Sequence, residues 1–284
     1  MRNLFLVNGF VSAAMMLLNR TIATSFPFPI ITVAIQNIIA LVGTLALHRV
    51  DPSSFRSFKT EHLIKLIPGT LLFAGALVFA MMSARLTSIP VASVCSNLRP
   101  LTTAVIDMFI AENRVTRPRL VGLCLVALGS VITAKSVDHV EFRGMQIAFV
   151  YVILTSLQST LDNQTMKSVK SQQTAVGINF YRLVLSTPLL IVLGLTLEGD
   201  TSVTQISRFS LLCLVASGIF CLCAGIVVFR LQAITSATSI QVANIAFKLV
   251  TTAVSIVIHG EVPNMLGWTG YVISMAGVLS YTIC

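Results

Sequence analysis

The sequence predicts an all-α membrane protein whose ten transmembrane helices form a 5+5 inverted-topology repeat. Of its 284 residues, 55% are hydrophobic and only 10% are charged, and the mean hydropathy is +0.90. A soluble domain has about 25% charged residues. Apolar windows of bilayer-spanning length recur along the whole chain. A weak internal similarity relates the first half, residues 1–137, to the second half, residues 138–284, so both halves are expected to form one domain.

Ten apolar windows, separated by short polar joints, are the candidate spans. The first window is too long for a removed signal peptide and lacks a small-residue cleavage site before a soluble domain, so we expect it to be retained. The windows cover residues 3–24, 29–48, 66–86, 88–110, 118–134, 142–162, 174–197, 208–231, 236–259 and 267–283.

The net charge of +9 is distributed unevenly over the joints. If the N-terminus is cytosolic, about eleven basic residues fall on the cytosolic side and about five on the opposite side, Arg20 among the five. The remaining three, Arg99, Arg182 and Lys248, lie inside spans. The positive-inside rule therefore predicts that both termini are cytosolic. No basic surface interleaved with aromatic residues is present, which argues against a nucleic-acid partner.

The sequence contains no arrangement typical of an enzyme. There is no glycine-rich phosphate loop, no His/Cys cluster with metal-ligand spacing and no Gly-x-Ser-x-Gly motif. All six cysteines lie within or at the end of spans, so a disulfide framework is not expected. We expect neither catalysis nor a bound metal or cofactor.

The ninth window carries a lysine, Lys248, near its middle. A charge at the bilayer centre costs roughly 3 to 10 kcal/mol, so Lys248 must face protein, water or a ligand. At helical spacing, Gln241 and Asn244 fall on the same stripe as Lys248, while apolar residues cover the rest of the helix. One face of this helix is predicted to be hydrated.

The fourth window carries a matching cation, Arg99, beside Pro100. An offset of 149 residues aligns Arg99 with Lys248 and residues 101–105 with 250–254. Because each half has five spans, the second half must enter the membrane in the opposite orientation, and such repeats meet at a site near the midplane. Arg99 and Lys248 are therefore expected to flank one central cavity. With a one-residue gap, the alignment also pairs Gly122 with Gly270 and Gly129 with Gly277.

Further polar residues within the spans are candidates for the same cavity. Amides suit the hydroxyls of a sugar or the edge of a base, and tyrosines suit stacking on a ring. The seventh window supplies a third cation, Arg182, which could instead snorkel to the interface. The remaining candidates are Asn19, Gln36, Asn97, Tyr151, Gln158, Asn179 and Tyr181.

Few acidic residues are available to neutralise these cations. The candidates, Asp107 and Asp162, both lie towards span ends, and Asp107 is about 12 Å along the helix from Arg99. The empty cavity is therefore expected to carry net positive charge. Such a site suits phosphate or diphosphate, since arginine offers a bidentate fork and lysine a compact charge.

The chain resembles the nucleotide-sugar transporter and triose-phosphate translocator branch of the drug/metabolite transporter superfamily. The resemblance covers all ten windows and depends on Asn19-Arg20 closing the first, Phe180-Tyr181 opening the seventh, and Lys248 in the ninth. In GDP-mannose transporters the corresponding motifs of the seventh and ninth spans read FYNN and GALNK. Here they read FYRL and NIAFK, so Phe180, Tyr181 and Lys248 match.

This resemblance implies an antiporter in the Golgi or ER membrane, with the two halves forming one transport domain. It would exchange a cytosolic GDP- or UDP-linked sugar for a luminal nucleoside monophosphate by alternating access, and a homodimer is one assembly that it allows. A sugar-phosphate/phosphate exchanger fits the same cations and needs no base-reading pocket. A cation exporter would need a central carboxylate, and a scaffold would not tolerate midplane cations.

Overall fold

The computed structural model describes residues 2–26, 28–54, 60–86, 95–110, 116–134, 142–169, 173–198, 208–245, 247 and 264–283. This part of the chain is helical and contains no strand. Short helical stretches also occur at 95–97 and 237–245. The main elements are α1 (Arg2–Ser25), α2 (Pro29–Val50), η1 (Pro52–Ser54), α3 (Thr60–Leu86), α5 (Arg99–Ile110), α6 (Arg117–Ala134), α7 (Phe142–Val169), α8 (Ala175–Glu198), α9 (Arg208–Gln232) and α11 (Met265–Ile283).

Six described helices, α1, α2, α3, α7, α8 and α9, are long and apolar enough to cross a membrane. They confirm an all-helical membrane protein and occupy six of the ten predicted windows. The helices α6 and α11, of 18 and 19 residues, occupy two more windows. The windows 88–110 and 236–259 lie partly outside the described residues. The full count of ten spans therefore stays a prediction.

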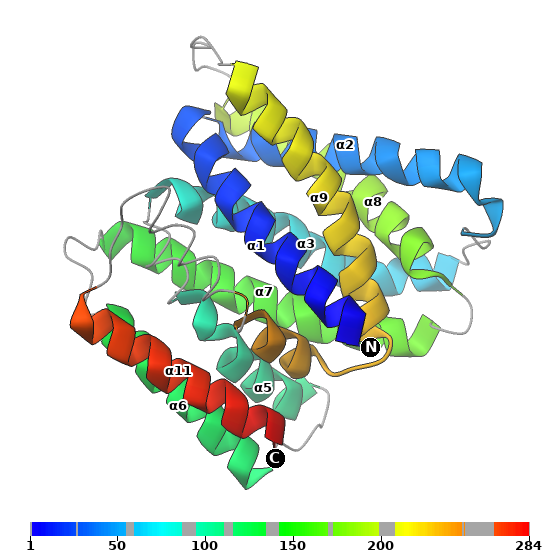
Figure 1. Ribbon diagram of the computed structural model, residues 1–284. Helices are drawn as coiled ribbons and strands as arrows, with labels where there is room; N and C mark the ends of the chain where they lie inside the picture. The colour runs from blue at the N-terminus through cyan, green and yellow to red at the C-terminus, as the bar shows by residue number, and fades with distance from the viewer. Residues whose placement is uncertain are drawn as a thin grey trace.

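The helices pack in a bundle with α2 and α9 towards one edge and the pair α6 and α11 towards the other (Figure 1). Between these edges, α3 packs against α7 and α1 against α9, while α2 packs against both α8 and α9. One apolar cluster joins α1, α2, α3, α8 and α9. A second joins α5, α6, α11 and residues 237–245. Two smaller apolar clusters lie elsewhere in the bundle, one among α3, α7, α8 and α9 and the other between Cys95 and α7.

Glycines bring α6 and α11 into close contact. A Cβ atom on Gly122 would lie 2.8 Å from the carbonyl oxygen of Gly277, and one on Gly129 would lie closer still to that of Gly270. Small residues of this kind allow helix backbones to approach closely in lipid, where dispersion replaces the hydrophobic effect as the source of helix association. The packing of this pair therefore depends on four glycines.

A carboxylate at the end of α8 caps the beginning of α2. The backbone N–H groups of Ile30 and Ile31 donate to the two carboxylate oxygens of Glu198, at 2.9 and 3.0 Å. The first turn of a helix has unpaired N–H groups and a partial positive charge, and Pro29 presents no N–H there. Glu198 therefore satisfies the start of α2 and fixes it against α8.

We expect Gly129→Ala to destabilise the protein, because the added methyl group would meet the backbone of Gly270, which cannot rotate away. Overpacking of this kind costs about 1 to 3 kcal/mol. Thermal unfolding in detergent should show a lower Tm. The matched control is Gly75→Ala, whose Cβ would meet only the side chain of Leu154 at 3.6 Å. An equal Tm for the two variants would contradict the role assigned to this glycine contact.

Candidate functional site

A cavity of about 270 Å³ lies among α1, α3, α7 and the start of α5. Four of the residues predicted from the sequence line it: Asn19, Arg99, Tyr151 and Asn244. Arg20, Ser12, Ser83, Ser96 and Phe247 also contribute to its wall. Apart from these, its described lining consists of small or apolar side chains. The cavity is a largely apolar space with polar groups at a few positions, which is typical of small-ligand sites.

The charged side chains in the described lining of the cavity are both basic. Arg20 and Arg99 both line it, and no carboxylate occurs among its described lining residues. The Nε of Arg99 donates to the Ser96 carbonyl oxygen at 3.2 Å, and one Nη donates to the Tyr151 hydroxyl at 3.4 Å. Its guanidinium also lies 5.5 Å from the centre of the Tyr151 ring. Within the described ranges, Arg99 is thus held by neutral groups and keeps its full charge for a ligand.

A break in the helix orients Arg99. Residue 98 is a turn residue between the helical stretch 95–97 and α5, and its N–H donates to the Cys95 carbonyl oxygen at 3.0 Å. In a continuous helix the N–H of residue 100 would donate to the Ser96 carbonyl, but Pro100 has no N–H. The Nε of Arg99 donates a hydrogen bond to that carbonyl oxygen instead. Interrupted helices of this kind are typical of membrane transport sites.

The α1 wall of the cavity contains Arg20, which was expected from the sequence at the extracytosolic end of the first window. The helix continues through Ser25, so Arg20 lies within α1. Its guanidinium donates to the Ala84 carbonyl oxygen on α3 at 2.5 Å. Lining residues at positions 9, 12, 13, 16 and 20 form one helical stripe. That periodicity was visible in the sequence and would have identified Arg20.

Asn244 joins the second half of the chain to the cavity. Its side-chain oxygen accepts from Asn8 of α1 at 2.6 Å. Phe247, three residues later, lines the cavity against Gly9, where α1 leaves no room for a side chain. Lys248 follows directly but lies outside the described residues, as does the aligned segment 250–254. The position of Lys248 in the cavity stays a prediction.

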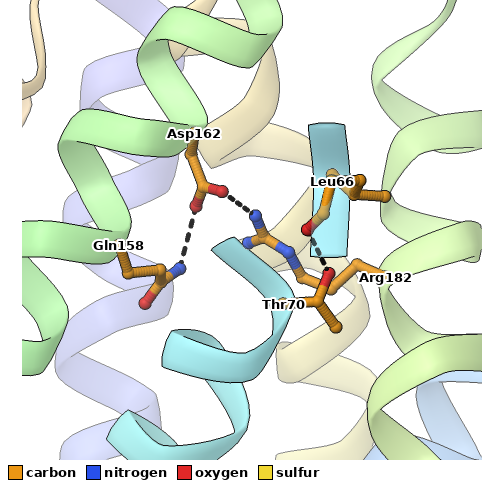
Figure 2. Close-up of polar contacts among 5 residues, drawn as sticks. All are labelled: Leu66, Thr70, Gln158, Asp162 and Arg182. Carbon is orange, nitrogen blue, oxygen red and sulfur yellow. Dashed lines mark hydrogen bonds and ion pairs between the residues drawn. The ribbon is translucent and has the colours of Figure 1, made fainter. Parts of the chain in front are cut away.

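Arg182 is buried and does not line the cavity. It forms an ion pair with Asp162 on α7, and its guanidinium carbon lies 4.9 Å from the centre of the Phe73 ring and 4.2 Å from that of Phe229. The expectation of an uncompensated third cation is therefore corrected, because α7 and α8 bring Asp162 to this arginine. The alternative of snorkelling to the interface is also wrong. Gln158 donates to the other Asp162 oxygen at 3.0 Å (Figure 2).

The remaining predicted residues are engaged elsewhere in the bundle. These residues are not among the described side chains that line the cavity. Gln36 donates to Asn19 and Ser217, Gln241 to Ser159 at 3.4 Å, Asn179 packs on Gly225, Tyr181 packs edge-to-face on Phe180, and Asn97 is buried. In this state they support the walls and do not face the ligand space.

Comparisons with known proteins point to one family. The sequence model of the Triose-phosphate Transporter family matches residues 2–282. The chain is 22% identical over 284 residues to the UDP-galactose/UDP-glucose transporter 7 of Arabidopsis thaliana, covering 96% of this chain and 86% of that protein. It is 25% identical over 197 residues to the GDP-mannose transporter of Aspergillus niger, covering 65% of this chain and 51% of that protein.

A solved crystal structure has the same fold. It aligns over 100% of this chain and 97% of its own, with a TM-score of 0.76 and 16% sequence identity. At that identity the likeness concerns the fold alone. The helical bundle is therefore one already seen in a crystal.

We expect Arg99→Gln to weaken binding of a nucleoside monophosphate roughly ten- to a hundredfold, because a charge-assisted hydrogen bond contributes about 1.5 to 3 kcal/mol. Titration of purified protein measures this directly. Arg119→Gln is the matched control, since Arg119 lies over the Tyr281 ring at 5.7 Å and outside the cavity. If both variants bind as the parent does, the cavity is not the anion site.

Proposed function

Since the chain belongs to the Triose-phosphate Transporter family, within the drug/metabolite transporters, and is a transporter rather than an enzyme, we propose that it is an antiporter for nucleotide sugars. It exchanges a cytosolic GDP- or UDP-linked sugar for a luminal nucleoside monophosphate. The observation that carries the proposal is the cavity, into whose wall Arg99 is fixed by the neutral Ser96 carbonyl and Tyr151 hydroxyl, with no carboxylate among the described lining residues.

Phosphate is the group that fits these cations. Arg99 presents a planar set of donors that matches phosphate oxygens, and its contacts to Ser96 and Tyr151 already orient it. Lys248 would add a compact charge from the second half. The amides of Asn19 and Asn244 and the hydroxyls of Ser12 and Ser83 lie in the same wall and suit sugar hydroxyls. A phosphorylated, hydroxyl-rich solute is the class of ligand that uses all of them.

The names of the relatives support a nucleotide sugar. One relative is named for UDP-galactose and UDP-glucose and the other for GDP-mannose. Both names join a nucleoside diphosphate to a hexose, and they differ in the base. The base is therefore left open in the proposal.

We also propose that the two halves form an inverted repeat. In such a repeat α1 corresponds to α7, α2 to α8, and α3 to α9. The contact of α3 with α7 then corresponds to that of α9 with α1, and the contact of α2 with α9 to that of α8 with α3. The pairs α2 with α8 and α6 with α11 map onto themselves. Asn37 donates to Ser186, the residue at the same 149-residue offset. These matched contacts support a pseudo-two-fold axis through the bundle.

The proposed setting is the Golgi or ER membrane with both termini in the cytosol, as the basic joints predict. A cysteine introduced at Ser54, between α2 and α3, should then react with an impermeant thiol reagent from the cytosolic side. Reaction from the luminal side alone would reverse the orientation.

Exchange follows from the charge of the cavity. An empty site would carry the charge of Arg99, and in this proposal that of Lys248, into the occluded state, where a charge costs several kcal/mol unless it is paired. Bound phosphate neutralises them, so the loaded protein changes conformation more readily than the empty one. A ligand acts in this way only through contacts that differ between states.

A sugar-phosphate/phosphate exchanger is the second candidate. The family is named for triose phosphate. The arginines that line the cavity would also bind a sugar phosphate. Such a solute presents no base, so inorganic phosphate should compete with it. For a nucleotide-sugar exchanger, inorganic phosphate should compete poorly with nucleoside monophosphates.

In proteoliposomes, we expect uptake of labelled UDP-galactose or GDP-mannose to be faster when the vesicles contain the matching nucleoside monophosphate. Lys248→Gln should reduce affinity for both solutes roughly ten- to a hundredfold, as both present phosphate, and Lys248→Arg should retain part of the activity. Lys167→Gln, at an exposed position of α7, is the matched control. Equal uptake into empty and loaded vesicles, or full transport by Lys248→Gln, would contradict the mechanism.

A further inference from the structure

The cavity and a set of charged contacts occupy opposite ends of the helix pair α3 and α7. Along α3 the cavity wall begins at Leu77, and on α7 it includes Tyr151. Gly69 of α3 lies opposite Asp162 of α7, and Gly75 lies opposite Leu154, so the two helices run antiparallel. Asp162 is eleven residues beyond Tyr151, about 16 Å along the helix. The charged contacts therefore lie beyond one end of the cavity.

The centre of these contacts is the ion pair of Asp162 with Arg182. Their side chains are 1% and 4% exposed. Gln158 donates a hydrogen bond to the second carboxylate oxygen of Asp162. The Arg182 side chain lies beside the turn of α3 that contains Leu66 and Thr70 (Figure 2). Buried charges in a membrane protein need such partners.

The pair belongs to the second half of the chain, but the first half closes over it. Phe73 of α3 places its ring 4.9 Å from the Arg182 guanidinium. A Cβ on Gly69 would lie 2.6 Å from a carboxylate oxygen of Asp162, so the α3 backbone presses on the charged pair. Separation of α3 from α7 and α8 would expose both charges together.

A second contact between the halves lies at the same end. Asp107 of α5 accepts from Thr160 of α7 at 2.6 Å and from Thr238 at 2.9 Å. Gln164 of α7 donates to the Ile110 carbonyl at the end of α5, at 2.9 Å. From Asp107 onward, α5 is thus tied to the second half at the end of the bundle that holds the ion pair.

We propose that the Asp162–Arg182 pair is a latch that closes this end of the transporter and separates each time the substrate site turns towards it. In the dry, closed state the charges must stay paired. When α3 moves away, water enters and hydrates both, which offsets the lost attraction. In the proposed orientation the latched end is the cytosolic one. The inference rests on the alternating access of the proposed function.

The latch predicts that Asp162→Asn shifts the protein towards the state open at this end. In vesicles without substrate, an impermeant thiol reagent should modify a cysteine at Ser159, buried beside the latch, at least tenfold faster from the latched side than in the parent. A cysteine at Ser12, in the cavity wall, should react more slowly from the opposite side. Labelling of the native cysteines is measured in the parent chain and subtracted.

Three further variants separate the latch from a loss of folding. Gly69→Ala keeps both charges but forces Asp162 away, and should give the same opposed shifts. The exchange Asp162→Arg with Arg182→Asp should restore part of the parent labelling. Asp51→Asn, an exposed carboxylate that accepts from Ser53, should change neither rate.

Unchanged rates at both reporter cysteines, or faster labelling at both, would overturn the latch. If Asp162→Asn does not accumulate in the membrane, Gly69→Ala decides by the same two rates. Because no substrate is added, this outcome is independent of the proposed solute. Failure of the proposed function would appear separately, as absence of exchange by the parent protein.

Discussion

The structure depends on the cost of placing a charge inside a membrane. Three sites in the described part of the chain show how charged side chains inside the bundle meet this cost. Arg182 pairs with Asp162 between two aromatic rings. Asp107 accepts two hydroxyl hydrogen bonds. Arg99 donates hydrogen bonds to a carbonyl and a hydroxyl oxygen and lines the cavity. Of these three, only the arrangement at Arg99 adjoins an open space, which is why we propose the ligand site there.

The paired charges of Asp162 and Arg182 lie towards one end of the bundle and the cavity with Arg99 towards the other, and we assign them different roles. The paired charges stabilise a closed interface between the halves, and removing one partner from a buried pair costs about 3 to 5 kcal/mol. The charge of Arg99 stays uncompensated by the described residues until an anion arrives. A ligand that supplies the missing negative charge thus changes the relative stability of the conformations, while the latch sets which end is closed in its absence. The broken helix at Pro100 links the two, because it holds Arg99 at the start of α5 and Asp107 in the same helix, further towards the latched end.

Composition and periodicity predicted much of this arrangement. The apolar windows predicted the six long helices. Four of the residues expected from the sequence at the site, Asn19, Arg99, Tyr151 and Asn244, line one cavity, and their binding role stays a prediction. Arg20 was missed because it was counted among the basic residues outside the membrane, although the first window extends to residue 24. Asp162 was one of two candidate anions in the sequence, but its pairing with Arg182 could not be predicted, since it lies 20 residues earlier on another helix and only the packing of the bundle brings the two together. Glu198 likewise caps a helix that begins far from it in sequence.

The central claim is that the cavity recognises phosphate, and competition binding tests it most directly. Labelled UDP-galactose or GDP-mannose is bound to the purified protein and displaced with the matching nucleoside monophosphate or with the nucleoside, which differs only by the phosphate. The account predicts that the monophosphate displaces the label at a concentration at least about tenfold lower, since charge-assisted contacts of about 1.5 to 3 kcal/mol are lost with the phosphate. Equal displacement by the two compounds would show that the base or sugar holds the ligand and would contradict the account.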